Sequence, residues 1–171
     1  MDPFETLGVE PAFGLDVAVL EQRHRNLSRA LHPDRYASSG AAERRRALGR
    51  AIEVNEAFRI LKDPVRRAEA LLARHGTQSG EGKEPPASPA LLMEVMERRE
   101  ALAEIRHSKD APALNSLIRE VRQSEAQALT TLGQAFAANT ENSAEILKRI
   151  GELRYYRRFL DEAAAIADDL L

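Results

Sequence analysis

Apolar residues recur at three- and four-residue steps through most of the chain, and no segment shows the strict alternation of a half-buried β-strand. In the first third of the chain, two such stripes follow one another. They are formed by Val17, Leu20, His24, Leu27 and Leu31, and by Leu48, Ala51, Val54, Asn55, Phe58 and Leu61. Because each stripe covers one face of a helix, the pattern predicts an all-α protein whose first two long helices form an antiparallel hairpin.

Capping and proline signals set the expected ends of the hairpin helices. Asp16 is a good N-cap for the first helix. Pro33 disfavours helical backbone at the residue before it, so this helix should end at His32. The second helix is expected over residues 41–61. The tripeptide 32–34 therefore lies at the predicted tip of the hairpin.

A change in composition divides the chain. Asp63 and Pro64 predict the start of a short helix, with Pro at its preferred first position, that ends near Gly76. The following segment, 77–88, reads TQSGEGKEPPAS and contains almost nothing apolar. This composition is typical of a linker. We therefore expect a first domain over residues 1–76 and a second over residues 89–171.

Three further helices are predicted in the second domain. Ser88 with Pro89 begins the first, Asp110 caps the second, and the third follows Asn139 and Thr140. Their apolar stripes are Leu91, Val95, Leu102 and Ile105, then Leu114, Leu117, Val121, Ala128, Leu132 and Phe136, then Ile146, Ile150, Leu153, Leu160, Ala164 and Ala167. Short connections between three helices predict an antiparallel three-helix bundle.

Composition excludes several classes of site. The 171 residues are 43% hydrophobic and 30% charged, with a formal net charge of −2 and no cysteine. Without cysteine there is no disulfide, thiolate zinc site or Cys-ligated cluster. No apolar run reaches the roughly 20 residues that cross a bilayer, and the N-terminus shows no signal peptide. We therefore expect a cytoplasmic protein without a membrane partner.

The tripeptide His32-Pro33-Asp34 admits three interpretations. A metal or catalytic site would need converging ligands or an activated nucleophile. The four histidines, at 24, 32, 75 and 107, include no i, i+4 pair, and no nucleophile with a base beside it can be proposed. His24 lies on an apolar stripe, where a buried structural histidine is the usual role. This interpretation has little support.

A nucleic-acid contact and a protein-recognition loop remain. Several arginines flank the tripeptide: Arg23, Arg25, Arg29, Arg35, Arg44, Arg45 and Arg46. Acidic residues are interspersed among them, the net charge is slightly negative, and no readout motif is present. A basic helix face beside an exposed loop could equally dock on an acidic protein surface, or be an ordinary solvated face.

Longer motifs add a resemblance to these observations. A basic helix, His32-Pro33-Asp34 and the segment VNEAFRILKDPVRRAE, residues 54–69, occur in the order found in J domains. The resemblance implies that the tripeptide stimulates ATP hydrolysis by a heat-shock-70-class chaperone. Arg25, Arg29 and Arg35 would dock on that chaperone with it. The chain departs from many J domains at His24 and Leu31, where aromatics are common, and at Ala30, where Lys is common.

The resemblance extends over nearly the whole chain and narrows the family. FETLGVEPAFGLD near the start, RRAEALLARHG at 66–76 and LLMEVMERREALAEI at 91–105 resemble HscB, the J-type co-chaperone of iron–sulfur cluster assembly. This implies two partners, the cluster scaffold IscU and the specialised chaperone HscA, and no cofactor of its own. It also implies an activator rather than an enzyme. A general J protein with another client, or a basic helical nucleic-acid binder, is the alternative.

Helical geometry also predicts a client-binding surface. At about 100° per residue, Leu92, Met93 and Met96 fall off the apolar stripe of their helix and should be exposed. The charged residues around them are Glu97, Arg99, Glu100 and Glu104. An exposed Leu and Met cluster is suited to adaptable binding, although it could instead pack against the first domain. The resemblance implies scaffold contact here, completed by Tyr155, which the same counting turns away from its core stripe, or by Phe159.

Overall fold

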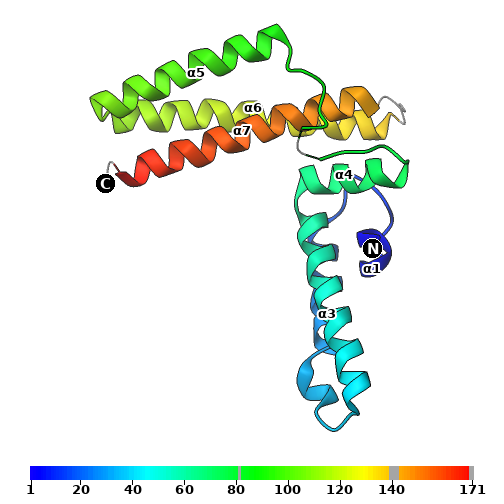
Figure 1. Ribbon diagram of the computed structural model, residues 1–171. Coiled ribbons are helices and arrows are strands. Elements are labelled where there is room, and N and C mark those ends of the chain that lie inside the picture. The colour runs from blue at the N-terminus through cyan, green and yellow to red at the C-terminus, as the bar shows by residue number, and fades with distance from the viewer. Residues whose placement is uncertain (81, 139–142, 170–171) are drawn as a thin grey trace. The chain divides into compact units, whose positions relative to one another are not determined.

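The computed structural model describes residues 1–80, 82–138 and 143–169, and these residues contain helices and loops but no strand. The predicted all-α fold is therefore confirmed. The chain divides into two compact units, Met1–Gln78 and Ser79–Leu171. Each is described by itself (Figure 1).

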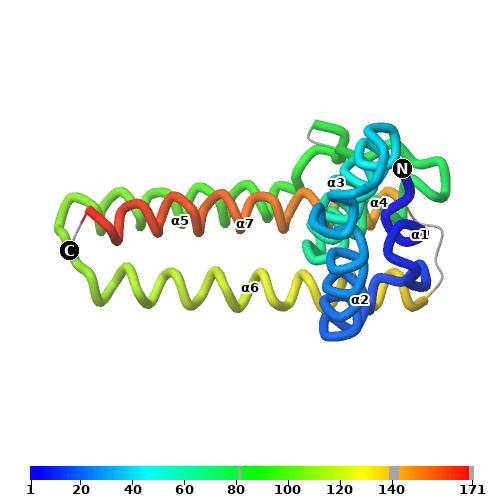
Figure 2. The backbone as a smooth tube through the Cα atoms, turned by 90° about the horizontal axis from the view of Figure 1, so that it is seen from below, coloured from blue at the N-terminus to red at the C-terminus, as the bar shows by residue number. Residues whose placement is uncertain are grey.

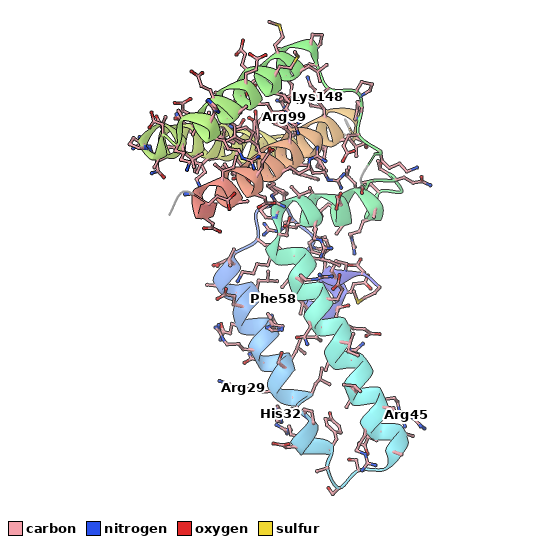
Figure 3. All side chains as sticks on the ribbon, turned by 60° about the vertical axis from the view of Figure 1, so that its left-hand side comes forward. Arg29, His32, Arg45, Phe58, Arg99 and Lys148 are labelled. Atoms are coloured by element: carbon pink, nitrogen blue, oxygen red, sulfur yellow. The ribbon has the colours of Figure 1, made fainter. Side chains whose placement is uncertain are left out.

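The N-terminal unit is built around the predicted hairpin. Its elements are α1 (Pro3–Leu7), α2 (Val17–Ala30), the 3₁₀ turn η1 (Pro33–Tyr36), α3 (Ala41–Lys62) and α4 (Pro64–Arg74). The Asp16 carboxylate caps α2 by accepting hydrogen bonds from the backbone nitrogens of Ala18 and Val19, at 2.8 and 3.4 Å. Figure 3 shows α2 and α3 side by side, with Phe58 of α3 facing α2.

Helix α1, which is only one turn long, was not predicted from the sequence. Asp2 caps it by accepting a hydrogen bond of 2.9 Å from the backbone nitrogen of Phe4, and Gly8 ends it with φ +64°. The side chains of Phe4 and Leu7 are almost completely buried. The short helix thus supplies two large core residues at the end of the hairpin away from the tip (Figure 1).

The predicted stripe of α3 was wrong at two positions, because Leu48 and Asn55 are both exposed. Leu48 is 58% exposed, and the adjacent Ala47 is buried in its place. Ala57 and Val54 complete the buried line with Leu61. Consecutive residues on a helix differ by about 100° in direction, so choosing the larger apolar residue at 48 moved the expected face off the true one.

A buried arginine joins the loop before α2 to the end of α3. Arg67 Nε donates a hydrogen bond of 2.7 Å to the carbonyl of Leu61, and Nη1 donates one of 2.6 Å to the carbonyl of Phe13. Its guanidinium also lies over the Phe13 ring, 5.7 Å from the centroid. Burial lowers the pKa of Arg67, and the nearby charge of Asp63 opposes that shift. The Phe13 carbonyl also accepts a hydrogen bond of 3.0 Å from the backbone nitrogen of Leu15, so the buried Arg67 adds a second donor there and links this loop to the end of α3.

We expect Arg67→Met to lower the free energy of unfolding of the N-terminal unit by about 1–3 kcal/mol, the cost of removing one partner of a buried hydrogen bond. Circular dichroism during urea unfolding of the full chain measures the change. Arg66→Met is the matched control. Arg66 forms a long ion pair of 3.8 Å with Glu56, and both side chains are partly exposed. Losing this pair should lower the free energy of unfolding by less than about 1 kcal/mol. Equal effects of the two substitutions would contradict the role given to Arg67.

The C-terminal unit contains three helices, α5 (Pro89–Ser108), α6 (Ala111–Ala137) and α7 (Ser143–Asp169). The side chains of Ser88 and Asp110 cap α5 and α6 as predicted, through hydrogen bonds of 3.3 and 2.9 Å. The predicted start of the last helix at Asn139 and Thr140 lies outside the described residues. Helices α6 and α7 run side by side over most of their length, in both Figure 1 and Figure 2.

The predicted stripe of α6 is confirmed at its five buried positions, whereas that of α7 was wrong beyond Leu153. The apolar residues buried there are Tyr155, Tyr156, Phe159, Ala163 and Ile166, in place of the predicted Leu160, Ala164 and Ala167. The prediction placed the next core residue seven positions after Leu153, at Leu160. In the structure, buried residues follow Leu153 at intervals of three, so the large rings of Tyr156 and Phe159 enter the core.

Candidate functional site

The predicted tip of the hairpin is formed by a change of backbone direction at His32. Its backbone is extended, with φ −61° and ψ 134°, and Pro33 begins η1 immediately after it. Helix α2 therefore ends at Ala30, with Leu31 as its C-cap. The side chains of His32 and Asp34 remain 59% and 90% exposed. The tripeptide is thus presented to solvent, with Pro33 holding the turn.

The contact between His32 and Asp34 is loose. Nδ1 of His32 lies 3.4 Å from the backbone nitrogen of Asp34 and 3.5 Å from its carboxylate oxygen. Both distances exceed those of good hydrogen bonds, and Nδ1 cannot accept from one group while donating to the other. Neither side chain is therefore committed to a strong interaction within the loop, and both are available to a partner.

The backbone around the tripeptide is held more firmly than its side chains, because the backbone nitrogen of Arg35 donates to the carbonyl of His32 and that of Ser39 to the carbonyl of Tyr36, each at 3.0 Å. The Tyr36 hydroxyl donates to the carbonyl of Ala30 at 3.4 Å, linking η1 to the end of α2. From α3, Nη1 of Arg44 donates to the carbonyl of Ser39 at 3.2 Å and to that of Ala37 at 3.4 Å. Arg44 therefore has a local structural role, which distinguishes it from the other arginines considered for binding.

The remaining predicted arginines differ in their availability. Arg25 lies 3.7 Å from Glu21 in an exposed i, i+4 pair, which holds it only weakly. The side chains of Arg29 and Arg35 are exposed and form no ion pair within residues 1–80, 82–138 and 143–169. Figure 3 shows Arg29 beside His32 at the same end of the hairpin.

His24 has the structural role that its position on the apolar stripe suggests. Its ring stacks on Phe58, with centroids 4.2 Å apart and planes 14° apart. Nε2 lies 2.9 Å from the side-chain oxygen of Asn55 and 3.3 Å from Ser28 Oγ. Among the residues described, no group of three or more His, Cys, Asp or Glu side chains could hold a metal ion.

The predicted apolar patch on α5 is exposed. Leu92 is 51% exposed, and Met93 and Met96 are each 63% exposed. The four charged residues named with them, Glu97, Arg99, Glu100 and Glu104, are exposed too. The patch therefore exists as a surface of flexible apolar side chains with charges around it. We refer to Leu92, Met93 and Met96 as the α5 patch.

Tyr155 does not have the predicted exposed position. It is only 9% exposed, and its ring centroid lies 6.2 Å from that of Phe159 and 5.5 Å from that of Tyr156. The residue shares an inward-facing side of α7 with these rings, because the true stripe of this helix differs from the predicted one. Tyr155 and Phe159 both line a cleft between α5 and α7 that Leu92 also borders.

A polar cluster centred on Arg98 joins the three helices beneath the α5 patch. Its guanidinium lies 2.7 Å from Glu94 of α5, donates a hydrogen bond of 2.8 Å to Ser124 Oγ of α6, and lies over the Tyr156 ring of α7. This cluster was not predicted from the sequence. The i, i+4 spacing of Glu94 and Arg98 was visible, but such pairs are usual on solvated faces.

Two family models match the chain. A DnaJ domain matches residues 2–70, and the HSCB C-terminal oligomerisation domain matches residues 87–164. A co-chaperone protein HscB homolog of Shewanella baltica (strain OS185) is 34% identical over 173 residues, which cover 100% of this chain and 99% of the relative. One of Shewanella sp. (strain W3-18-1) is 35% identical over 176 residues with the same coverage. The chain belongs to the HscB family of J-domain co-chaperones.

Solved HscB structures share the fold of this family member. Chaperone HscB from Vibrio cholerae superposes with a TM-score of 0.86 at 31% identity, covering 100% of both chains. Human co-chaperone HscB gives a TM-score of 0.87 at 24% identity, over 96% of this chain and 81% of the human chain. The predicted resemblance is confirmed. Across the described part of the chain, no helix is both long enough and apolar enough to span a membrane.

The two buried tyrosines of the HscB C-terminal region have raised pKa values. For Tyr155, burial raises the pKa above the usual 10.0, and the positive charge of Arg98 partly opposes the shift. For Tyr156, burial and then the negative charge of Glu94 raise the pKa. The neutral phenol is therefore favoured in the folded protein for both residues, and their ionisation is linked to unfolding.

We expect the C-terminal unit to lose stability in alkali through these tyrosines. Above a pH of about 10 the unfolded chain releases phenolic protons that the folded chain retains, so unfolding becomes more favourable until the folded-state pKa is passed. Below a pH of about 10, both states keep the phenolic protons, and the stabilising effect of these tyrosines is fully present. Urea unfolding between about pH 8 and pH 11 should show a shallower loss for Tyr155→Phe with Tyr156→Phe than for the unchanged chain. Tyr36→Phe, in the other unit, is the control, and an unchanged pH dependence in the double variant would contradict the assignment.

Proposed function

We propose that this co-chaperone delivers an IscU-like iron–sulfur cluster scaffold to an HscA-like heat-shock-70-class chaperone and stimulates the ATPase of that chaperone. The observation that carries the proposal is the pairing of two exposed elements in one chain. The first is the His32-Pro33-Asp34 tip, with its side chains free to bind. The second is the α5 patch in the region matched by the HscB C-terminal model.

In this proposal, the tip and its basic surroundings bind the chaperone. Arg25, Arg29 and Arg35 are exposed and can pair with acidic groups on the partner. The Asp34 carboxylate can then engage a cation of the chaperone, while the His32 ring can donate or accept a hydrogen bond. Because backbone hydrogen bonds of 3.0 Å, from Arg35 to His32 and from Ser39 to Tyr36, already order the loop, these contacts cost little further ordering.

The α5 patch binds the scaffold in the same proposal. Met93 and Met96 have flexible side chains that adapt to an apolar partner surface, and Glu97, Glu100 and Glu104 can pair with cations around it. Holding the scaffold on the chain that binds the chaperone raises the effective concentration of one partner near the other. The chain has no cysteine, so it assists cluster transfer without thiolate ligation of the cluster.

We expect Asp34→Asn to abolish stimulation of the chaperone ATPase, because the neutral amide cannot form the ion pair given to the carboxylate. Steady-state ATP hydrolysis by the organism's HscA-like chaperone, with and without its IscU-like scaffold, measures this effect. The far-ultraviolet circular dichroism and the scaffold affinity of the variant should equal those of the unchanged chain, since the side chain is 90% exposed.

Three results of that assay bear on the proposal. Synergistic stimulation by chain and scaffold, lost with Asp34→Asn or His32→Gln, supports both partners. Stimulation that the scaffold does not increase would retain the J-domain role and reject this client. No stimulation under either condition would reject the proposed chaperone partner.

We expect replacement of Leu92, Met93 and Met96 by Ala to weaken scaffold binding by about 2–4 kcal/mol, as the loss of hot-spot residues does. Isothermal titration calorimetry of the full chain against the scaffold measures the affinity. The matched control replaces Val17 and Val19, which are exposed apolar residues of α2, by Ala and should leave scaffold affinity unchanged. Equal affinity of the patch variant and the unchanged chain would contradict scaffold binding at α5.

A further inference from the structure

The C-terminal unit contains a cleft of about 550 Å³ between α5 and α7. Leu91, Leu92 and Val95 line it from α5, and Tyr155 and Phe159 line it from α7. The N-terminal end of α5 stands apart from the other two helices of this unit in Figure 1. Binding pockets typically enclose roughly 300–1,000 Å³. The cleft is therefore large enough for side chains of a bound partner.

Residues within the segment 82–88, before α5, also line this cleft, and an ion pair joins this segment to α7. Glu84 forms an ion pair with Arg154, and both side chains are largely buried. A Cβ atom at Gly151 would lie 3.4 Å from the Cβ and Cγ atoms of Glu84. The segment therefore packs against α7 at Gly151. It is thus part of the C-terminal unit.

Two cations border the cleft without a partner. Arg99 of α5 and Lys148 of α7 line it, and neither side chain forms an ion pair or hydrogen bond within the part of the chain that the structure describes. Figure 3 labels both residues on their helices. By contrast, the charge of Glu84 is balanced by Arg154, and Glu152 lies 2.8 Å from Arg149.

Among the lining acids, Glu162 has no ion pair or hydrogen bond within the described residues, and it lies more than three turns along α7 from Lys148. At the end of the cleft bordered by Lys148, the unpaired charge is therefore positive. An apolar wall next to unpaired cations is complementary to a ligand that combines apolar groups with an anion.

We propose that the cleft receives a partner segment in which an apolar side chain stands next to a carboxylate, and that Lys148 binds this carboxylate. The choice of the IscU-like scaffold as the protein that carries the segment rests on the proposed function. The outer side of α5 presents Glu97, Glu100 and Glu104, so a partner spanning both surfaces carries acidic residues toward the cleft and basic residues toward the outer side.

The cleft chemistry is tested with two short blocked peptides, one made of Leu and Asp and the other of Leu and Lys. Methyl-labelled full-length chain is titrated with each peptide and followed by nuclear magnetic resonance. We expect the Asp peptide to shift the methyl signals of Leu91 and Val95 at about tenfold lower concentration than the Lys peptide, since like charges disfavour the wrong partner. Lys148→Glu should abolish this preference. Arg119→Glu, an exposed charge reversal on α6 that does not line the cleft, should retain it.

Equal binding of the two peptides, or shifts confined to methyl groups outside the cleft, would overturn the proposal. Measuring the scaffold affinity of these variants distinguishes a failure of this proposal from a failure of the proposed function. If the α5 patch variant loses scaffold binding while Lys148→Glu binds as the unchanged chain does, the function stands and carboxylate recognition is rejected. If the Asp peptide is preferred but the scaffold does not bind, the cleft chemistry stands and the proposed client is rejected.

Discussion

The placement of α5 depends on one largely buried guanidinium, that of Arg98. A buried charge is tolerated only when it is paired and hydrogen-bonded, and Arg98 meets this requirement with groups from three helices: Glu94 of α5, Ser124 of α6 and Tyr156 of α7. Any large movement of α5 would leave this charge without some of its partners. The helix is thereby held beside α7 while its N-terminal part keeps an apolar surface and a cleft.

In the N-terminal unit, the residues that stabilise the fold and the tripeptide proposed to bind a partner lie at opposite ends of the hairpin. Its core lies between the helices and under α1 and α4, whereas the tripeptide lies at the opposite end of the hairpin (Figure 1). Backbone carbonyls of the tip accept hydrogen bonds from Tyr36 and Arg44, so the side chains of His32 and Asp34 need not stabilise the loop. A residue that contributes little to folding can be retained for recognition, and rigid support keeps its position defined.

Local signals in the sequence predicted most of the fold, while positions set by packing were predicted less well. Asp16, Ser88 and Asp110 cap helices as expected because an N-cap acts within its own turn. The exposure of the α5 patch also followed from helical geometry. Leu48 and Tyr155 were placed wrongly because several faces of α3 and α7 carry apolar residues, and only the neighbouring helices decide which face is buried. The Arg98 cluster could not be predicted, since Ser124 lies 26 residues away.

The apolar character of the α5 patch is itself an argument for binding. Single exposed apolar residues are ordinary on protein surfaces, but Leu92, Met93 and Met96 lie within two turns of one helix, and Leu92 also borders an apolar cleft. The bundle does not need them for stability, because Leu102 and Ile105 bury the C-terminal part of α5 and Arg98 holds its middle. Polar residues at these three positions would keep the fold and remove a surface of flexible apolar side chains. Their presence is therefore better explained by a partner that covers them than by the folding of the bundle.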